Sequence, residues 1–214
     1  MERSKQQQFA DLVAAVAKCD LCPRMRGRRR VLGPDNGNLD SEAVFVAEAP
    51  GRLGADKFGK PLHGDQTGRN FEEYLRNAGL DRESLFITNA VLCNPRRTDG
   101  NNATPSAAEI RNCSRHLATV LDIVKPKYVV TLGRVALSSL AVIKPHKYTL
   151  SRSVATLCPW GSHFVYPLFH PSPRACIARS MRTQLEDYRR LADLLPTGPM
   201  CAIIESALAS KKPA

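Results

Sequence analysis

The chain has 214 residues, of which 43% are hydrophobic and 24% charged, and it carries a formal net charge of +11. This length is enough for a single domain with a full core. No apolar stretch approaches the roughly 20 residues of a membrane-spanning helix, and residues 1–9 are polar. We therefore expect a cytoplasmic protein without a membrane segment or a signal peptide. The excess of positive charge indicates a polyanionic partner, and a generic basic protein is the simpler alternative.

Helix and strand patterns alternate along the chain. The predicted strands are short apolar runs, and the predicted helices carry apolar residues every three or four positions. In chain order we predict a helix over 6–18, a strand over 43–47, a helix over 68–78, a strand over 85–89, a helix from 104 with Thr104 as N-cap and Pro105 in its first turn, a strand over 128–132, a helix to 140, a strand over 164–168, a helix over 176–195 and a short C-terminal helix.

This alternation is typical of an α/β fold in which a mostly parallel central sheet lies between two layers of helices, a three-layer α/β/α sandwich. We see neither an internal repeat nor an interdomain linker. We therefore expect one domain over residues 1–196, followed by a tail over 197–214.

Four of the seven cysteines suggest a metal centre. Cys19 and Cys22 share one CxxC turn, Cys93 follows a predicted strand, and Cys113 lies in a predicted helix. An odd number of cysteines without an export signal favours metal-bound thiolates over disulfides. Four such thiolates suit an iron–sulfur cluster or a structural zinc, whereas CxxC alone also fits a redox pair. The other three are expected to be partly buried thiols: Cys158, Cys176 and Cys201.

Arginines directly follow two of these cysteine segments. The run after Cys22 comprises Arg24, Arg26, Arg28, Arg29 and Arg30, and the pair after Cys93 comprises Arg96 and Arg97. Arginine side chains bind phosphates well, although a run of charges is often only a solvated surface. Their position directly after candidate metal ligands in the sequence favours a surface that faces DNA.

Three predicted strands end in chemically distinctive residues. Glu48 follows the first strand, Asn89 ends the second, and His170 follows the last within the sequence His-Pro-Ser-Pro. In parallel sheets, functional residues gather at the carboxyl ends of the strands. We therefore expect a carboxylate, an amide and an imidazole in one crevice. Each also has a structural alternative: an ion pair for Glu48, a loop cap for Asn89 and a satisfied core histidine for His170.

Taken together, these segments resemble the iron–sulfur families 4 and 5 of the uracil-DNA glycosylase superfamily. The matching segments lie between Cys19 and Leu195 and read CDLC, AEAPGRLGADKFGKPLHGDQTG, ITNAVLC, TPSAAEIRNC, VVTLG and HPSP. The resemblance implies a [4Fe–4S] cluster on the four cysteines and excision of uracil, or other deaminated bases, from DNA. We expect a monomer that associates with the nucleoid.

The departures from both families concern the base pocket. Glu48 matches the carboxylate of the family 4 motif, with Ala47 in place of the leading glycine, and Asp65 matches the family 5 aspartate. Leu62 stands where family 4 stacks a phenylalanine on the base. The segment 96–103 is longer than either family leads us to expect. The resemblance therefore indicates a divergent member, intermediate between the two families.

The resemblance also implies a role for each candidate residue. The expected catalytic residues are Asp65, Glu48 and His170, those that contact the base are Ala49, Leu62 and Asn89, and Arg174 joins the arginine segments in holding DNA. We expect His170 to stabilise the departing base. We expect Asp65, in preference to Glu48, to stabilise the sugar cation or to orient the attacking water. The alternatives are a catalytically inactive iron–sulfur DNA-binding module and a zinc-bound nucleic-acid module.

Overall fold

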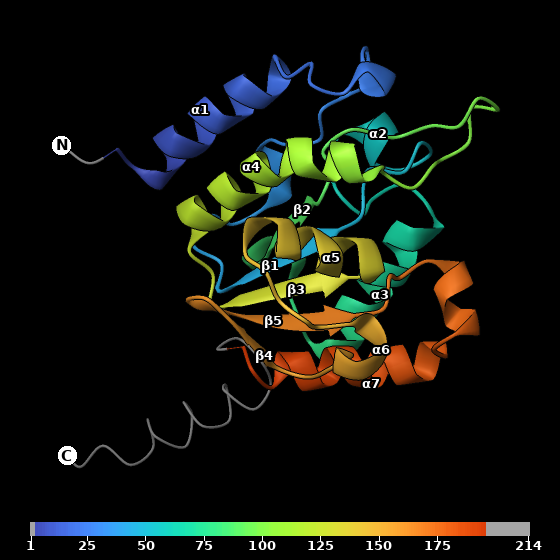
Figure 1. Ribbon diagram of the computed structural model, residues 1–214. Helices are drawn as coiled ribbons and strands as arrows, with labels where there is room; N and C mark the ends of the chain where they lie inside the picture. The colour runs from blue at the N-terminus through green and yellow to red at the C-terminus, as the bar shows by residue number, and fades with distance from the viewer. Residues whose placement is uncertain (1–2, 196–214) are drawn as a thin grey trace.

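A computed structural model describes residues 3–195 and places a five-stranded sheet at the centre of the molecule (Figure 1). The strand order is β2-β1-β3-β5-β4. The first four of these strands are parallel, and β4 pairs antiparallel with β5 at one edge. The strands are β1 (Ala43–Ala47), β2 (Phe86–Asn89), β3 (Tyr128–Leu132), β4 (Cys158–Trp160) and β5 (His163–Leu168).

Helices cover both faces of this sheet. The α-helices are α1 (Lys5–Ala17), α2 (Ala55–Phe58), α3 (Gln66–Ala78), α4 (Ala107–Val124), α5 (Arg134–Ile143), α6 (Leu150–Ser153) and α7 (Met181–Ala192). Short 3-10 turns are η1 (Pro23–Met25), η2 (Pro34–Asn36), η3 (Arg82–Ser84) and η4 (Pro173–Ile177). Within residues 3–195, none of the helices has the length and apolar character needed to cross a bilayer.

Two hydrophobic cores define the three layers. Helices α1, α4 and α5 pack on one face of the sheet, and α3 and α7 pack on the other (Figure 1). Alternate side chains of β1 serve the two cores: Val44 and Val46 face the first, whereas Phe45 faces the second. Because β1 is covered on both sides, its sequence is continuously apolar. The predicted α/β/α architecture around a mostly parallel sheet is confirmed.

Some predicted boundaries are wrong. Thr104 does not cap α4, because Ser106 does: its hydroxyl accepts a hydrogen bond from the Glu109 backbone at 3.3 Å, and the Glu109 carboxylate accepts the Ser106 N–H at 2.7 Å. This reciprocal capping box begins the helix after Pro105. Helix α3 begins at Gln66 rather than at 68, with Asp65 as its N-cap. The short helix expected near the C-terminus lies outside the described residues, as does Cys201.

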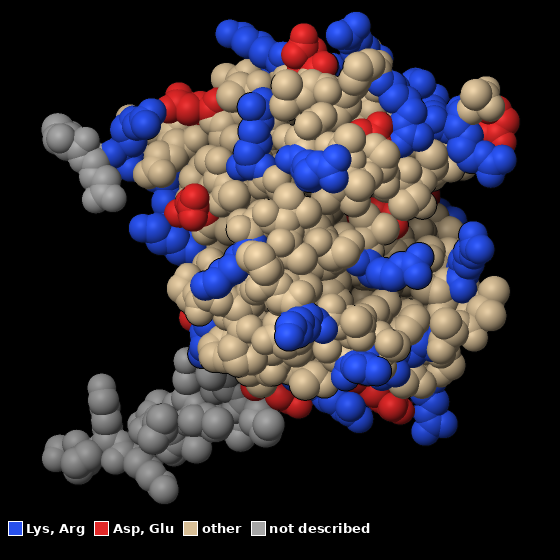
Figure 2. Space-filling view, viewed as in Figure 1, with Lys and Arg blue, Asp and Glu red and all other residues tan. Residues whose placement is uncertain are grey.

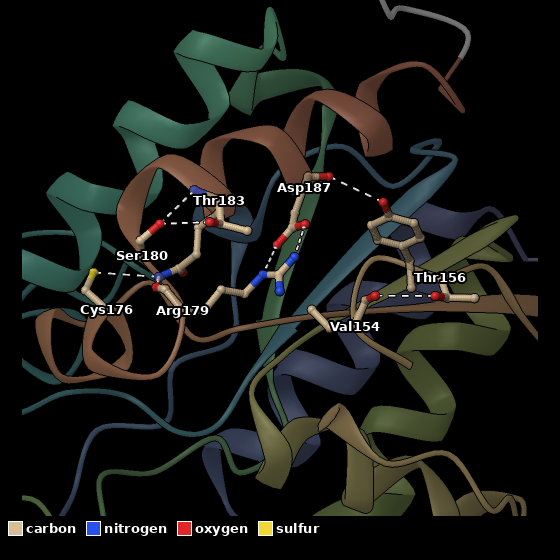
Figure 3. Close-up of polar contacts among 9 residues, drawn as sticks. Val154, Thr156, Cys176, Arg179, Ser180, Thr183 and Asp187 are labelled. Carbon is tan, nitrogen blue, oxygen red and sulfur yellow. Dashed lines mark hydrogen bonds and ion pairs between the residues drawn. The ribbon is translucent and has the colours of Figure 1, made fainter. Parts of the chain in front are cut away.

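The predicted helix over 176–195 is two elements, η4 and α7, joined by polar contacts (Figure 3). Ser180 starts α7 by accepting a hydrogen bond from the Thr183 backbone at 3.2 Å. Arg179, just before this cap, donates two hydrogen bonds to the Asp187 carboxylate, one of them 2.6 Å from Nη2 to Oδ1. The backbone oxygen of Asp187 accepts a hydrogen bond from Tyr166 of β5 at 3.4 Å. These contacts hold the segment that follows β5 against α7.

The Arg179–Asp187 pair gives a prediction about stability. The Asp187 side chain is 2% exposed, so Asp187→Asn leaves a guanidinium that has lost its counter-ion in a largely buried place. We expect the free energy of unfolding to fall by about 3 kcal/mol in chemical denaturation. Arg182→Gln is the matched control, because the Arg182–Glu186 pair is mostly exposed and its loss should cost under about 1 kcal/mol. Equal losses in the two variants would contradict this account.

Candidate active site

A cavity of about 430 Å³ lies at the carboxyl ends of the parallel strands. In Figure 1 these ends point toward the side that carries α2, η4 and the long loop before α4. All six residues that the sequence assigned to catalysis or base contact line this cavity, together with one candidate phosphate ligand: Glu48, Ala49, Leu62, Asp65, Asn89, His170 and Arg174. The fold therefore brings these separate segments to one place.

Asn89 lines this cavity and carries an unpaired hydrogen-bond donor. Its side chain is 2% exposed, and its amide nitrogen Nδ2 has no hydrogen-bond partner among residues 3–195. Buried polar groups are nearly always paired, and an unpaired donor costs about 1 to 3 kcal/mol. A donor that lines a cavity in this state is suited to a ligand that brings an acceptor, such as a carbonyl oxygen.

His170 is held at the end of β5 by neighbours on two sides. The amide of Asn70 in α3 donates a buried hydrogen bond to the backbone oxygen of Pro171 at 2.8 Å. On the other side, Gly133 has a φ of +94°, and a side chain there would place its Cβ 3.3 Å from the Cβ of His170. Glycine at the end of β3 therefore gives the histidine its space.

Burial lowers the pKa of His170 to about 4, and the nearby negative charge of Asp65 acts in the opposite direction. The imidazole is therefore neutral near pH 7. A neutral ring donates one hydrogen bond and accepts another, so it can donate to an anion without first acquiring a proton.

The two carboxylates have different surroundings. Burial raises the pKa of Glu48, and the charge of Arg134 partly offsets this effect. Asp65 caps α3, because its Oδ1 accepts a hydrogen bond from the Gly68 backbone at 2.9 Å. The second oxygen of Asp65 lies against the loop after β1, where a Cβ on Gly54 would be 2.5 Å from it. Asp65 thus combines a structural cap with a charge near His170.

Leu62 lies in the cavity wall with a strained backbone. It is buried and has a φ of +48°, a region that non-glycine residues seldom occupy. Its carbonyl oxygen would be 2.8 Å from a Cβ placed on Gly68 at the start of α3. The tight junction between Leu62 and α3 fixes the position of this apolar side chain in the cavity.

The four candidate metal ligands line a second, small cavity. Cys19, Cys22, Cys93 and Cys113 share it with Leu21, Met25, Arg30 and Asn112. Two of the sulfurs accept hydrogen bonds: Cys113 from the Leu92 backbone at 3.4 Å, and Cys22 from the Asn112 amide at 3.5 Å. Burial raises the pKa of Cys113 to about 12 and that of Cys93 to about 11. Thiolates at these positions therefore need a cationic partner.

Four thiols that line one cavity suit an iron–sulfur cluster or a structural zinc. Among residues 3–195, no three His, Cys, Asp or Glu side chains form a group that could hold one metal ion. A tetrahedral zinc site gathers its sulfurs about 2.3 Å from one atom, whereas a cluster spans several atoms. All the described cysteines are free of disulfides. The four thiols and their hydrogen-bond donors therefore form a candidate metal centre.

Several arginines expected to bind DNA make contacts within the protein. Arg24 forms a two-point ion pair with Glu109, at 2.9 Å and 2.6 Å. Arg30 donates to the backbone oxygens of Arg28 and Cys19, and Arg96 pairs with Asp56 at 2.7 Å. The exposed members of the set are Arg26, Arg29, Arg97 and Arg174, besides Arg24 itself. Figure 2 shows Lys and Arg side chains spread over this face of the molecule, with one group at the upper right.

The cavity also contains residues that the sequence analysis did not single out. Asn94 and Asn102 line it, and Arg134 acts on Glu48 from the start of α5. Asn94 directly follows the candidate ligand Cys93, which is the one sequence signal that pointed to it. Asn102 lies in the long 96–103 segment and carried no such signal.

The environment of His170 gives a prediction about protonation. We expect its imidazole to remain neutral at pH 6 in NMR titration of the ring, and Asp65→Asn to lower its pKa further by removing the nearby charge. Because the folded-state pKa lies below the usual value of about 6.5, the unfolded chain takes up the proton first. Stability should therefore fall as the pH drops from about 6.5 toward 4. Titration near 6.5 in the folded protein would contradict the assignment.

Comparison with known proteins places the chain in a family. A sequence model of the uracil DNA glycosylase superfamily matches residues 34–192. The chain is 37% identical over 158 residues to the type-4 uracil-DNA glycosylase of Thermotoga maritima, covering 73% of this chain and 78% of that protein. It is 31% identical over 199 residues to the type-4 enzyme of Saccharolobus solfataricus, covering 89% and 88%.

A type-5 relative is also similar. The type-5 uracil-DNA glycosylase of Pyrobaculum aerophilum is 26% identical over 193 residues, covering 77% of this chain and 83% of that protein. Both Glu48 and Asp65 line the one cavity. From the fold, the cavity and these matches together, the chain belongs to the uracil-DNA glycosylase superfamily.

Proposed function

We propose that the protein is a monofunctional uracil-DNA glycosylase, which hydrolyses the N-glycosidic bond of uracil in DNA and leaves an abasic site. The observation that carries this proposal is the unpaired amide donor of Asn89 in the same cavity as His170 and two carboxylates. At position 4 of the ring, uracil has a carbonyl oxygen that accepts a hydrogen bond from such a donor, whereas cytosine has an amino group that cannot accept one. Asn89 therefore favours uracil over cytosine.

The remaining residues suit the departure of a base as an anion. The neutral imidazole of His170 donates a hydrogen bond to the base oxygen on which negative charge develops. Asp65 supplies a negative charge beside the cationic sugar, and Glu48 orients the attacking water. Leu62 gives the flipped base an apolar contact in place of an aromatic stack. Ala49 leaves the cavity open beside Glu48.

The four cysteines would hold a [4Fe–4S] cluster. The contribution of such a cluster would be structural, because its ligands come from three separate segments of the chain. Cys19 and Cys22 hold the turn that leads into the first arginine segment, and Cys93 anchors the loop that continues to Asn94 in the base cavity. The ligand set thereby supports one wall of the active site.

DNA binding and base flipping follow from exposed groups near the cavity. The exposed arginines supply contacts to phosphates, and Arg174 lies in the cavity wall itself. Ile177 is 88% exposed at the end of η4, a few residues beyond Arg174. An exposed aliphatic side chain there can fill the space that a flipped base leaves in the duplex. We propose a monomer that acts on DNA in the cytoplasm, associated with the nucleoid.

The second candidate function is a catalytically inactive DNA-binding module with the same cluster. The feature that favours it is the leucine at position 62 in place of an aromatic base contact. Release of uracil from a duplex oligonucleotide, with abasic sites in the product, separates the two functions. The wild-type protein should release uracil, and an intact, iron-loaded protein that leaves the oligonucleotide unchanged would overturn the proposed activity.

The two carboxylates should differ in how much each contributes to the rate of uracil excision. Asparagine caps helices as well as aspartate does, so Asp65→Asn removes the charge beside His170 and keeps the start of α3. We expect this change to slow single-turnover excision about tenfold more than Glu48→Gln, a difference of about 1.4 kcal/mol in barrier. Melting temperature and iron content serve as controls for folding. A larger loss in Glu48→Gln would assign the principal role to Glu48.

The cluster gives a prediction about composition. Anaerobic purification should yield a brown protein in which iron and sulfide are present in similar amounts, and Cys113→Ser should lose both, because this ligand is the most buried of the four. Cys158→Ser is the matched control, since Cys158 is also buried but lies outside the ligand cavity. Zinc alone in the wild-type protein, or full iron retention in Cys113→Ser, would refute the assignment.

A further inference from the structure

A groove of about 440 Å³ adjoins the base cavity. It is lined by Arg52, Leu53, Asp65, Gln66, Thr67, Asn101 and Asn102. Asp65, Thr67 and Asn102 line the base cavity as well, so the two spaces share a wall. Whatever occupies the groove therefore lies directly beside whatever occupies the base cavity.

One side of the groove is a hairpin formed by the long segment 96–103. Its two arms are joined by a bridge between Arg96 and Asn102 and by hydrogen bonds from Arg97 N to Asn101 O and from Ala103 N to Pro95 O, each 2.8 Å. This pairing gives the segment a defined structure and holds Asn101 and Asn102 at the rim of the groove.

Asn102 attaches this hairpin to the loop after β1. Its Oδ1 accepts hydrogen bonds from the Arg52 backbone and from the Asn94 amide, both at 3.0 Å. Asn94 also donates to the backbone oxygen of Pro50 at 2.6 Å. These contacts occupy the carbonyl end of the Asn102 side chain and leave its Nδ2 without an acceptor in the described part of the chain. The groove therefore has two fixed walls.

The chemistry of the groove matches one nucleotide. Within residues 3–195 the Arg52 guanidinium takes part in no ion pair, and the only hydrogen bond from Arg52 to a side chain comes from its backbone N–H, so its charge is available to a phosphate. Gln66, Asn101 and Asn102 add neutral amides. Leu53 is 58% exposed and offers an apolar surface to the face of a base or a sugar. Asp65 also lines the groove, on the wall shared with the base cavity, so a phosphate is held on the Arg52 side. One cation, several amides and one apolar side chain suit a single nucleotide.

We propose that this groove is a subsite for the nucleotide next to the flipped one in the same strand, and that Arg52 binds its phosphate. The inference rests on the proposed function, because it takes the base cavity to hold a nucleotide of DNA. If the groove holds this nucleotide, the hairpin formed by segment 96–103 positions the damaged strand beside Asp65.

The test pairs one residue with one phosphate and measures affinity, so that it does not depend on excision. Duplexes carrying a tetrahydrofuran abasic site receive one neutral methylphosphonate at a time, within two nucleotides on either side of the site. For the wild-type protein, one of these positions should weaken binding about tenfold. Arg52→Gln should show no further loss at that position, because the contact is already missing. It should also lower the salt dependence of log K by about 0.9.

Arg115→Gln is the matched control, because Arg115 is an exposed arginine of α4 that lines neither space. It should keep the full tenfold effect of the methylphosphonate. Equal effects of every methylphosphonate on the wild type and on Arg52→Gln would overturn the subsite, whether or not uracil is excised. The predicted coupling in a protein that fails to excise uracil would support the subsite and refute the proposed activity.

Discussion

The site depends on the parallel pairing of β1 with its two neighbours. The register aligns Ala47 with Asn89 across β1 and β2, so Glu48 leaves β1 one residue beyond the level of Asn89. On the other side, the pairing of β3 with β5 brings Gly133 against His170 just beyond the strands. A shift of one residue in either register would turn these side chains to the opposite face. The two apolar cores, each buried by its own helices, set the register.

Desolvation gives these side chains their chemistry. The same burial that keeps the His170 imidazole neutral raises the pKa of Glu48 and leaves the Asn89 amide without a partner. A buried donor such as the Asn89 amide, which has no hydrogen-bond partner among residues 3–195, lowers the stability of the folded protein. A base with a carbonyl oxygen in the right place restores the missing hydrogen bond. In the function we propose, selectivity for the base and stabilisation of its departure would both follow from the desolvation of the cavity.

Much of the fold could be predicted because the buried strands are short, continuous runs of apolar residues. Ala43–Ala47 and Tyr128–Leu132 are covered on both faces, so each is nearly continuously apolar and its limits are sharp. The edge strand β4 was missed because it has three residues, one of them an exposed proline. The break at Ser180 was missed because the apolar pattern continues across it, and only the cap interrupts the helix.

The site residues that directly follow predicted strands could be predicted from the sequence. Contacts between residues that are distant in sequence could not. Glu48, Asn89 and His170 follow predicted strands, so their convergence could be anticipated. The ion pair between Arg24 and Glu109 joins residues 85 positions apart, and a run of charges does not reveal such a partner. The attachment of Asn102 to Arg52 across 50 positions is of the same kind. Local patterns therefore identified the cavity but not the hairpin that extends it.

The most direct test of this account is a crystal structure of the protein with duplex DNA that contains 2′-fluoro-2′-deoxyuridine, whose glycosidic bond resists cleavage because fluorine disfavours the sugar cation. The account predicts that the uracil lies outside the base stack, in the cavity of about 430 Å³, with a carbonyl oxygen accepting from Asn89 Nδ2 and another facing His170. A uracil that remains stacked in the duplex, or that binds elsewhere on the protein while the cavity holds only water, would contradict it.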